Sequence, residues 1–192
     1  MKNNKLNFLI AAGLILMAAS ARIINHEMHL YNLAPVAALG LFSGAVIKDK
    51  RYAFVFAILA QFIGDVYIGL FTPWQGFYGI EQVLVYAALI LVTVLGSRMG
   101  KPSALKVFGY TIAGSTIFFL ISNFGIWLSI QLGGIDILHY GKGFTGLMNT
   151  YIAAIPFFRN TLLGDMAGAV LLFGAYALLQ KALSGKMQKA EA

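Results

Sequence analysis

Long apolar runs separated by short polar segments account for most of the chain. Six of them approach or reach the ~20 residues with which a helix crosses the hydrocarbon core of a bilayer. They cover Leu6–Ile24, Leu33–Ile47, Tyr52–Phe71, Glu81–Arg98, Val107–Gln131 and Pro156–Gln180. The pattern predicts an all-α integral membrane bundle of six transmembrane helices, forming one domain over residues 1–192.

The composition supports the membrane assignment. Hydrophobic residues make up 59% of the chain and charged residues 11%, whereas a soluble domain carries about 25% charged residues. The chain has no cysteine, which excludes disulfides, thiolate catalysis and cysteine metal sites.

Basic residues are distributed asymmetrically between the connections. With the N-terminus in the cytoplasm, 11 of the 14 Lys and Arg residues fall on the cytoplasmic side. These are Lys2, Lys5, Lys48, Lys50, Arg51, Arg98, Lys101, Lys106, Lys181, Lys186 and Lys189. The positive-inside rule therefore predicts that both the N-terminus and the C-terminus are cytoplasmic. The net charge of +7 then reflects topology and gives no argument for a nucleic-acid partner.

The first run also resembles a secretory signal peptide, because Ala19-Ser20-Ala21 matches a small-residue cleavage site. The apolar run continues past that site to Ile24, so we expect a retained helix. On the outer side, the longest predicted connection is Leu132–Ile155. A loop of this length is usually functional or disordered, and its aromatic residues and glycines favour an ordered lid.

Four charges lie in or at the edge of the apolar runs: Arg22, Asp65, Arg159 and Asp165. An unpaired charge at the centre of a bilayer costs at least ~2.5–3.5 kcal/mol. Two interpretations remain open for the aspartates. They either form structural ion pairs with Arg22 or Arg159, or they belong to a site for a ligand or cation that opens to the outer side.

Other polar and aromatic residues are candidates for the same site. Asn123 and Trp127 are four residues apart and share a helix face. Arg159 and Asn160 stand in the first turn of the last predicted helix, where an arginine can clamp an anionic group. Each has a plainer alternative: an interhelical hydrogen bond for Asn123, the interfacial aromatic belt for Trp127, and snorkelling for Arg159. For Glu81, the dipole of its helix is the plainer explanation.

Motifs for catalysis and for metal binding are weak. His26, Glu27 and His29 fall one residue short of the H-E-x-x-H spacing. They could still contribute to an outer metal site, but an interfacial linker is the favoured interpretation. The chain has no G-x-S-x-G and no Walker motif. We therefore expect no enzyme, no bound metal and no cofactor.

Small residues are spaced one helical turn apart in the second run, at Ala34 and Ala38 and at Gly40 and Gly44. Such spacing lets a neighbouring helix approach closely. It predicts either close packing within the bundle or a docking face for a partner protein.

Several longer motifs carry a resemblance to a known family. They are the segment 32–45 (NLAPVAALGLFSGA), Gly64-Asp65, the segment 122–127 (SNFGIW) and the segment 156–165 (PFFRNTLLGD). Together they resemble an uncharacterised bacterial membrane family described as transport proteins, which in turn is similar to the S components of energy-coupling factor (ECF) transporters. The resemblance covers about Arg22 to Leu179.

The resemblance implies a small six-helix protein of the bacterial inner (cytoplasmic) membrane that binds a vitamin or other micronutrient in an outward-facing pocket. S components deliver their substrate through a transmembrane coupling protein and ATPase subunits. They typically dock through an alanine-x-x-x-alanine motif on the first helix, whereas here the nearest match is Ala34 and Ala38 in the second run.

We therefore expect a substrate-binding subunit whose pocket is formed by Asp65, Asn123, Trp127, Arg159, Asn160 and Asp165, with Leu132–Ile155 closing over it. Its partners would be a small molecule, membrane lipid and coupling subunits. A stand-alone ion-coupled secondary transporter and a non-transport membrane scaffold are the alternatives.

Overall fold

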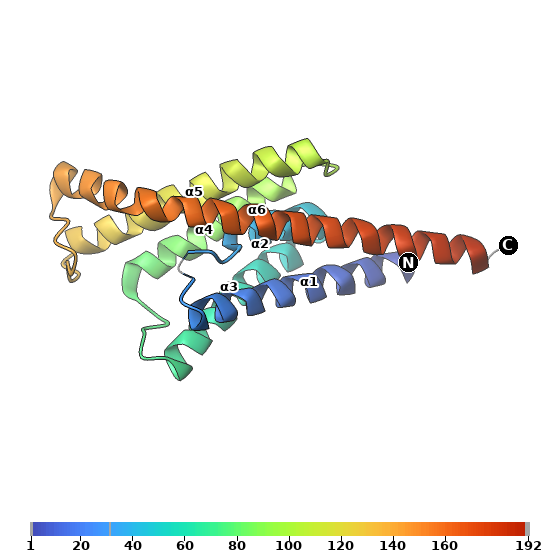
Figure 1. Ribbon diagram of the computed structural model, residues 1–192, viewed down its shortest axis with the longest axis horizontal. Coiled ribbons are helices and arrows are strands. Elements are labelled where there is room, and N and C mark those ends of the chain that lie inside the picture. Colours follow the sequence, from blue (N-terminus) through green and yellow to red (C-terminus); the bar gives the residue numbers. More distant parts are fainter. Residues whose placement is uncertain (1, 31, 191–192) are drawn as a thin grey trace.

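The computed structural model describes residues 2–30 and 32–190. Their secondary structure consists of helices without strands, in agreement with the all-α prediction. The helices are α1 (Lys2–Glu27), α2 (Val36–Val46), α3 (Lys50–Phe71), α4 (Gly79–Ser97), α5 (Ala104–Gln131) and α6 (Gly143–Ala190), packed as an elongated bundle (Figure 1).

Five of these helices are long and apolar enough to cross a membrane, which indicates a multi-pass membrane protein. The exception is α2, which has 11 residues. At 1.5 Å per residue it is about 16 Å long, roughly half the thickness of the hydrocarbon core. The second predicted span is therefore a short helix, preceded by the non-helical segment 32–35.

The helix α6 differs most from the prediction. It begins at Gly143 and contains Pro156, which was expected to start it. The lid predicted at Leu132–Ile155 is thus wrong in extent, because only residues 132–142 form a loop. Packing on α5 accounts for the longer helix: the Tyr151 hydroxyl donates to the Leu120 carbonyl at 2.7 Å. A proline is tolerated inside a membrane helix when neighbouring elements stabilise it.

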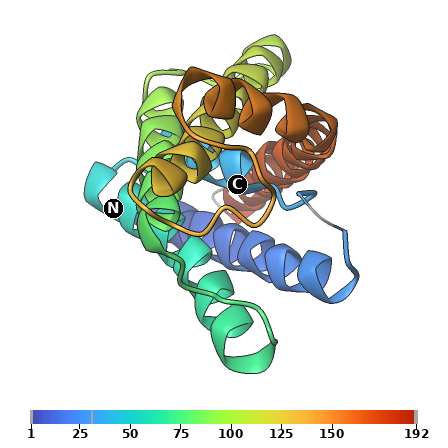
Figure 2. The same ribbon diagram turned by 90° about the vertical axis from the view of Figure 1, so that its left-hand side faces the viewer.

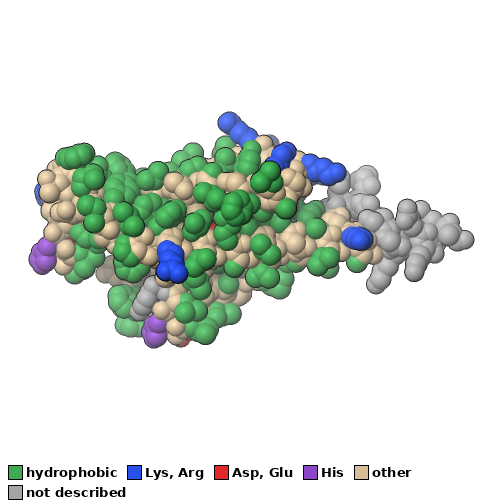
Figure 3. All heavy atoms as spheres, turned by 45° about the horizontal axis from the view of Figure 1, so that its top comes forward, with side chains coloured by type: hydrophobic (Ala, Val, Ile, Leu, Met, Phe, Trp, Pro, Cys, Tyr) green, Lys and Arg blue, Asp and Glu red, His purple; other side chains and the backbone are tan. Residues whose placement is uncertain are grey.

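The start of α1 and the end of α6 lie at the same end of the bundle (Figure 1). The loops before α2, before α4 and before α6 lie at the opposite end, and Figure 2 looks onto this loop end. In the space-filling view, hydrophobic side chains cover most of the length of the molecule, and Lys and Arg side chains gather toward the end that holds the termini (Figure 3).

The short helix α2 is the centre of the bundle and contacts each of the other five helices. Eight of its 11 residues are buried. A Cβ atom added at Gly44 would collide with the Thr93 backbone oxygen, and one at Gly96 would collide with the Leu41 backbone oxygen. The small residues of α2 thus serve close packing within the bundle, the first of the two interpretations that their spacing offered.

The packing of α2 against α4 can be tested with one added methyl group. A Cβ at Gly40 would lie 3.0 Å from the Leu89 Cδ1 atom and 3.2 Å from the Thr93 Oγ1 atom. We expect Gly40→Ala to lower the free energy of unfolding by about 1–3 kcal/mol, the usual cost of overpacking. Gly109→Ala in α5 is the matched control, because nothing lies within 4 Å of its added Cβ. Thermal unfolding of both variants in detergent measures the difference, and equal melting temperatures would contradict the packing.

Candidate functional site

A partly open pocket of about 810 Å³ lies at the loop end of the bundle. Its volume is in the range of sites that bind small molecules. All three loops at this end contribute to its lining: Leu30, Asn32, Trp74, Tyr78, Leu138 and Tyr140. The remaining lining comes from Ala34, in the connection before α2, and from all six helices, including the first residue of α2, Val36. The pocket therefore reaches from the loops to the start of the central helix.

One wall of the pocket is aromatic. Phe118 and Phe119 come from α5, and Phe157 and Phe158 come from α6. The rings of Phe119 and Phe158 contact each other, with centroids 4.7 Å apart. This wall suits a flat or apolar group of a ligand.

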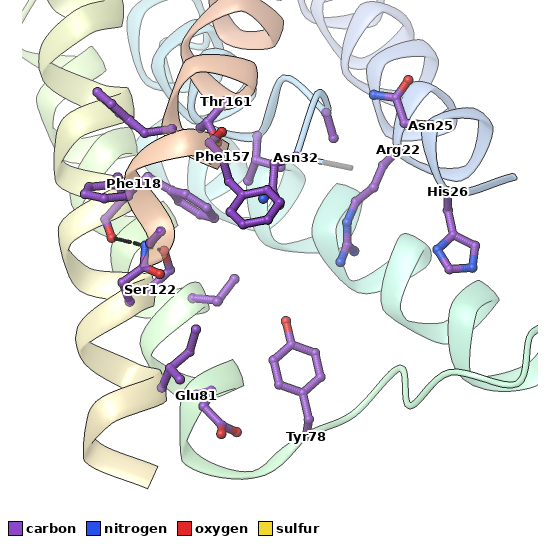
Figure 4. A pocket seen from close by; sticks show the side chains of 18 of the residues that line it. Arg22, Asn25, His26, Asn32, Tyr78, Glu81, Phe118, Ser122, Phe157 and Thr161 are labelled. Atoms are coloured by element: carbon purple, nitrogen blue, oxygen red, sulfur yellow. Dashed lines mark hydrogen bonds between the residues drawn. The ribbon is translucent and has the colours of Figure 1, made fainter. Parts of the chain in front are cut away.

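The opposite side of the pocket is polar. Arg22, Asn25 and His26 come from the last turns of α1, and Tyr78 and Glu81 come from the start of α4. Figure 4 shows the Arg22 guanidinium and the Tyr78 hydroxyl pointing toward one another into the same space. Burial, followed by the nearby Asp65 carboxylate, raises the pKa of the Tyr78 phenol above its usual value. Tyr78 therefore offers a neutral hydroxyl at physiological pH.

Asp65 lies directly behind this polar side and is fully buried. Its carboxylate forms an ion pair with the Arg22 guanidinium, at 2.6 Å. It also accepts hydrogen bonds from the Gln82 amide at 3.0 Å and from the Tyr86 hydroxyl at 2.7 Å. Arg22 donates in addition to the Gln61 carbonyl at 2.9 Å. Asp65 thus forms the ion pair with Arg22 that was one of its two predicted roles. The network of these side chains joins α1, α3 and α4.

Asp165 is also fully buried, but it has a different role. Its carboxylate accepts a hydrogen bond from the Ala38 N–H at 3.0 Å and another from the Ser115 hydroxyl at 2.7 Å. Ala38 is in the first turn of α2, whose own N-cap residue, Pro35, offers no side-chain hydrogen bond. Asp165 therefore caps α2 from another helix, where a negative charge also suits the helix dipole.

The other end of α2 is capped in the same manner. The Lys50 ammonium group donates to the Gly44 carbonyl at 2.8 Å and to the Ile47 carbonyl at 3.1 Å. Opposite charges at the two ends stabilise a buried helix that is too short to reach water at both ends.

The structure brings only part of the predicted site together. Asn123, Arg22 and Glu81 line the pocket, and the Asn123 amide donates to the Phe119 carbonyl at 2.8 Å. Asp65 lies behind the lining and pairs with Arg22, which lines the pocket, whereas Asp165 lies outside the lining at the start of α2.

The remaining predicted residues are placed elsewhere. Trp127 donates its indole N–H to the Gly143 carbonyl at 2.9 Å, which joins the end of α5 to the start of α6. Arg159 and Asn160 are exposed on α6 and do not line the pocket. A clamp on a pocket ligand by Arg159 is therefore not supported by this geometry.

The carboxylate of Asp136 holds the short loop 132–142 together through hydrogen bonds within the loop. Asp136 accepts hydrogen bonds from the backbone N–H groups of Tyr140 at 2.9 Å and Gly141 at 2.7 Å. The Gly141 hydrogen bond is the main reason that the pKa of Asp136 is lowered. The loop presents Leu138 and Tyr140 to the pocket, so the covering role expected for the longer segment is confined to these residues.

The residues around His26 do not assemble as metal ligands. Among the described residues, no three His, Asp or Glu side chains are grouped as a metal ion would need. His26 lines the pocket, whereas the Glu27 carboxylate accepts a hydrogen bond from the Tyr67 hydroxyl at 3.1 Å.

Comparison with known proteins adds a family assignment. No curated protein and no solved structure matches the chain. A family model matches residues 2–188, nearly the whole length of the chain. The chain belongs to DUF6580, a family of unknown function.

Proposed function

We propose that this protein binds a small organic molecule at the loop end of its membrane bundle and serves as the substrate-binding subunit of an uptake system. The observation that carries the proposal is the pocket of about 810 Å³, which has an aromatic wall on one side and polar side chains on the other. A vitamin or other micronutrient, with a ring system and polar substituents, matches that division.

The resemblance to ECF S components supports this proposal. A pocket at the end opposite the termini is where an outward-facing site would lie if both termini are cytoplasmic. We also propose that the protein lies in the bacterial inner membrane, with the loop end of the bundle on the outer side. The chain contains no nucleotide-binding motif, so ATP-driven uptake would need a coupling protein and ATPases. Such a partner cannot dock on the Ala34 and Ala38 pair, because Ala38 is buried in the centre of the bundle.

Filling the pocket tests the proposal. Ala154 lines it from α6, and Ala154→Trp is expected to remove a co-purified metabolite by occupying its space. Ala167→Trp is the matched control, because Ala167 is an exposed residue of the same helix outside the pocket lining. The measurement is mass spectrometry of small molecules extracted from the folded, detergent-purified proteins. A metabolite retained equally by both variants would contradict binding in this pocket.

A second candidate function is that of a stand-alone secondary transporter. The buried Asp65 is one side chain away from the pocket, through Arg22. Protonation or sodium binding at Asp65 would release Arg22 and change the pocket, which is how an ion gradient could be coupled to substrate. Uptake by vesicles that contain this chain alone, driven by an ion gradient and abolished by Asp65→Asn, would favour this function.

A further inference from the structure

We infer that the pocket selects an organic cation, a molecule with an ammonium group or a positively charged nitrogen heterocycle attached to an apolar body. This inference rests on the proposed function, since it assumes that the pocket holds a small molecule. It replaces the anionic ligand that the sequence suggested through Arg159.

The positive charge in the pocket is already neutralised. Among the described residues that line the pocket, Arg22 is the only Lys or Arg, and its guanidinium is 2.6 Å from the Asp65 carboxylate. The same nitrogen also donates to the Gln61 carbonyl. An anionic ligand at Arg22 would have to compete with a buried carboxylate that cannot move into water.

The negative charge in the pocket is not neutralised. Glu81 lines the pocket from the first turn of α4, and Figure 4 shows its carboxylate at the end of the pocket near Tyr78. Across the part of the chain that the structure describes, the Glu81 carboxylate forms no ion pair and no hydrogen bond.

Helix capping does not account for Glu81. A glutamate at this position often accepts a hydrogen bond from the backbone N–H of the N-cap residue. Here the Tyr78 N–H donates instead to the Gln82 side-chain oxygen at 3.1 Å. The Glu81 carboxylate is thus left for a partner that enters the pocket.

The lining as a whole favours a cation over an anion. The charges of Arg22 and Asp65 cancel in their ion pair, and the charge of the Glu81 carboxylate remains. Aromatic faces attract cations through their quadrupoles, and the pocket offers the rings of Tyr78, Trp74 and Tyr140 as well as the phenylalanine wall. A carboxylate and aromatic rings in one partly enclosed space are the chemistry that recognises an organic ammonium ion.

Three probes that share one body and differ in charge test the inference: phenethylammonium, 2-phenylethanol and phenylacetate. Binding to the full-length protein in detergent is measured by isothermal titration calorimetry. We expect phenethylammonium to bind most tightly, and Glu81→Gln to weaken it at least about tenfold, which corresponds to one lost charge-assisted hydrogen bond. We expect Glu81→Lys to shift the preference to phenylacetate. Glu27→Gln is the control, since it removes the same charge from the loop end outside the pocket lining.

The outcomes separate the two proposals. Tighter binding of phenylacetate by the unmodified protein, or equal binding of phenethylammonium by the Glu81→Gln and Glu27→Gln variants, overturns the cation inference alone. If none of the three probes binds and no metabolite co-purifies with the protein, the proposed function fails together with the inference. Circular dichroism checks that each variant is folded.

Discussion

Replacing Asp165 with alanine is expected to lower the free energy of unfolding by about 3–5 kcal/mol. The change removes the acceptor of two buried donors, the Ala38 N–H and the Ser115 hydroxyl. Each buried donor left without an acceptor costs about 1–3 kcal/mol, and loss of the charge at the start of α2 adds to that cost. Because α2 touches every other helix, the damage is expected to spread through the bundle. Thermal or denaturant unfolding in detergent, followed by Trp fluorescence, measures the loss.

Two further variants separate the capping role from a general loss of packing. Asp165→Asn keeps an oxygen that can accept from the Ala38 N–H, so its cost is expected to be about 1–2 kcal/mol, near that of losing a favourable helix–charge interaction. Ser115→Ala removes one donor and leaves the cap in place, so it should cost about 1 kcal/mol. If Asp165→Ala were no more costly than Asp165→Asn, Asp165 would not act as the cap of α2.

The Arg22–Asp65 pair is expected to show the second large effect, and the two partners should differ. Asp65→Ala leaves the Arg22 charge, the Gln82 amide and the Tyr86 hydroxyl without their acceptor. Removing one partner of a buried pair costs about 3–5 kcal/mol. The Arg22 side chain retains 17% exposure toward the pocket, which places the expected loss at the lower end, about 3 kcal/mol. Arg22→Met should cost less, because Asp65 keeps two hydrogen-bond donors, the Gln82 amide and the Tyr86 hydroxyl.

A double-mutant cycle measures whether the two residues act together. The Arg22→Met/Asp65→Ala protein should be more stable than the sum of the two single losses predicts, because it contains no uncompensated charge. Melting temperatures of the four proteins give the coupling. Strictly additive losses would mean that the ion pair does not hold α1 against α3.

The residues that break an apolar pattern were the most informative part of the sequence. Asp65 and Arg22 are charges in membrane helices, and their cost in lipid made an ion pair between them one of two expected outcomes. The longest apolar runs also predicted the first and last residues of α1, α3, α4 and α5 to within a few residues. The length and hydropathy of a run are what make a helix suited to cross a membrane. The polar residues Gln61 and Gln82 interrupt the same apolar runs, and they join the network of these two charges.

Features that depend on tertiary contacts could not be read from the pattern. The hydrogen bond between Asp165 and Ala38 joins residues 127 positions apart, and only the packed bundle brings the cap to α2. Pro156 is a common first residue of helices, but contacts between α5 and α6 extend the helix before it. Phe118 and Phe157 line the pocket, but hydropathy alone does not single them out, because a ring that lines a pocket has the same hydropathy as one that faces lipid.

The most direct measurement is native mass spectrometry of the intact protein, released gently from detergent. The account predicts a species with one small molecule bound per chain, which is lost in the Ala154→Trp protein and retained in the Ala167→Trp protein. Coupling and ATPase subunits in the same spectrum would identify the uptake system to which the chain belongs. A spectrum with only the bare chain and a heterogeneous series of lipid adducts, unchanged by Ala154→Trp, would contradict the proposal that this pocket binds a substrate.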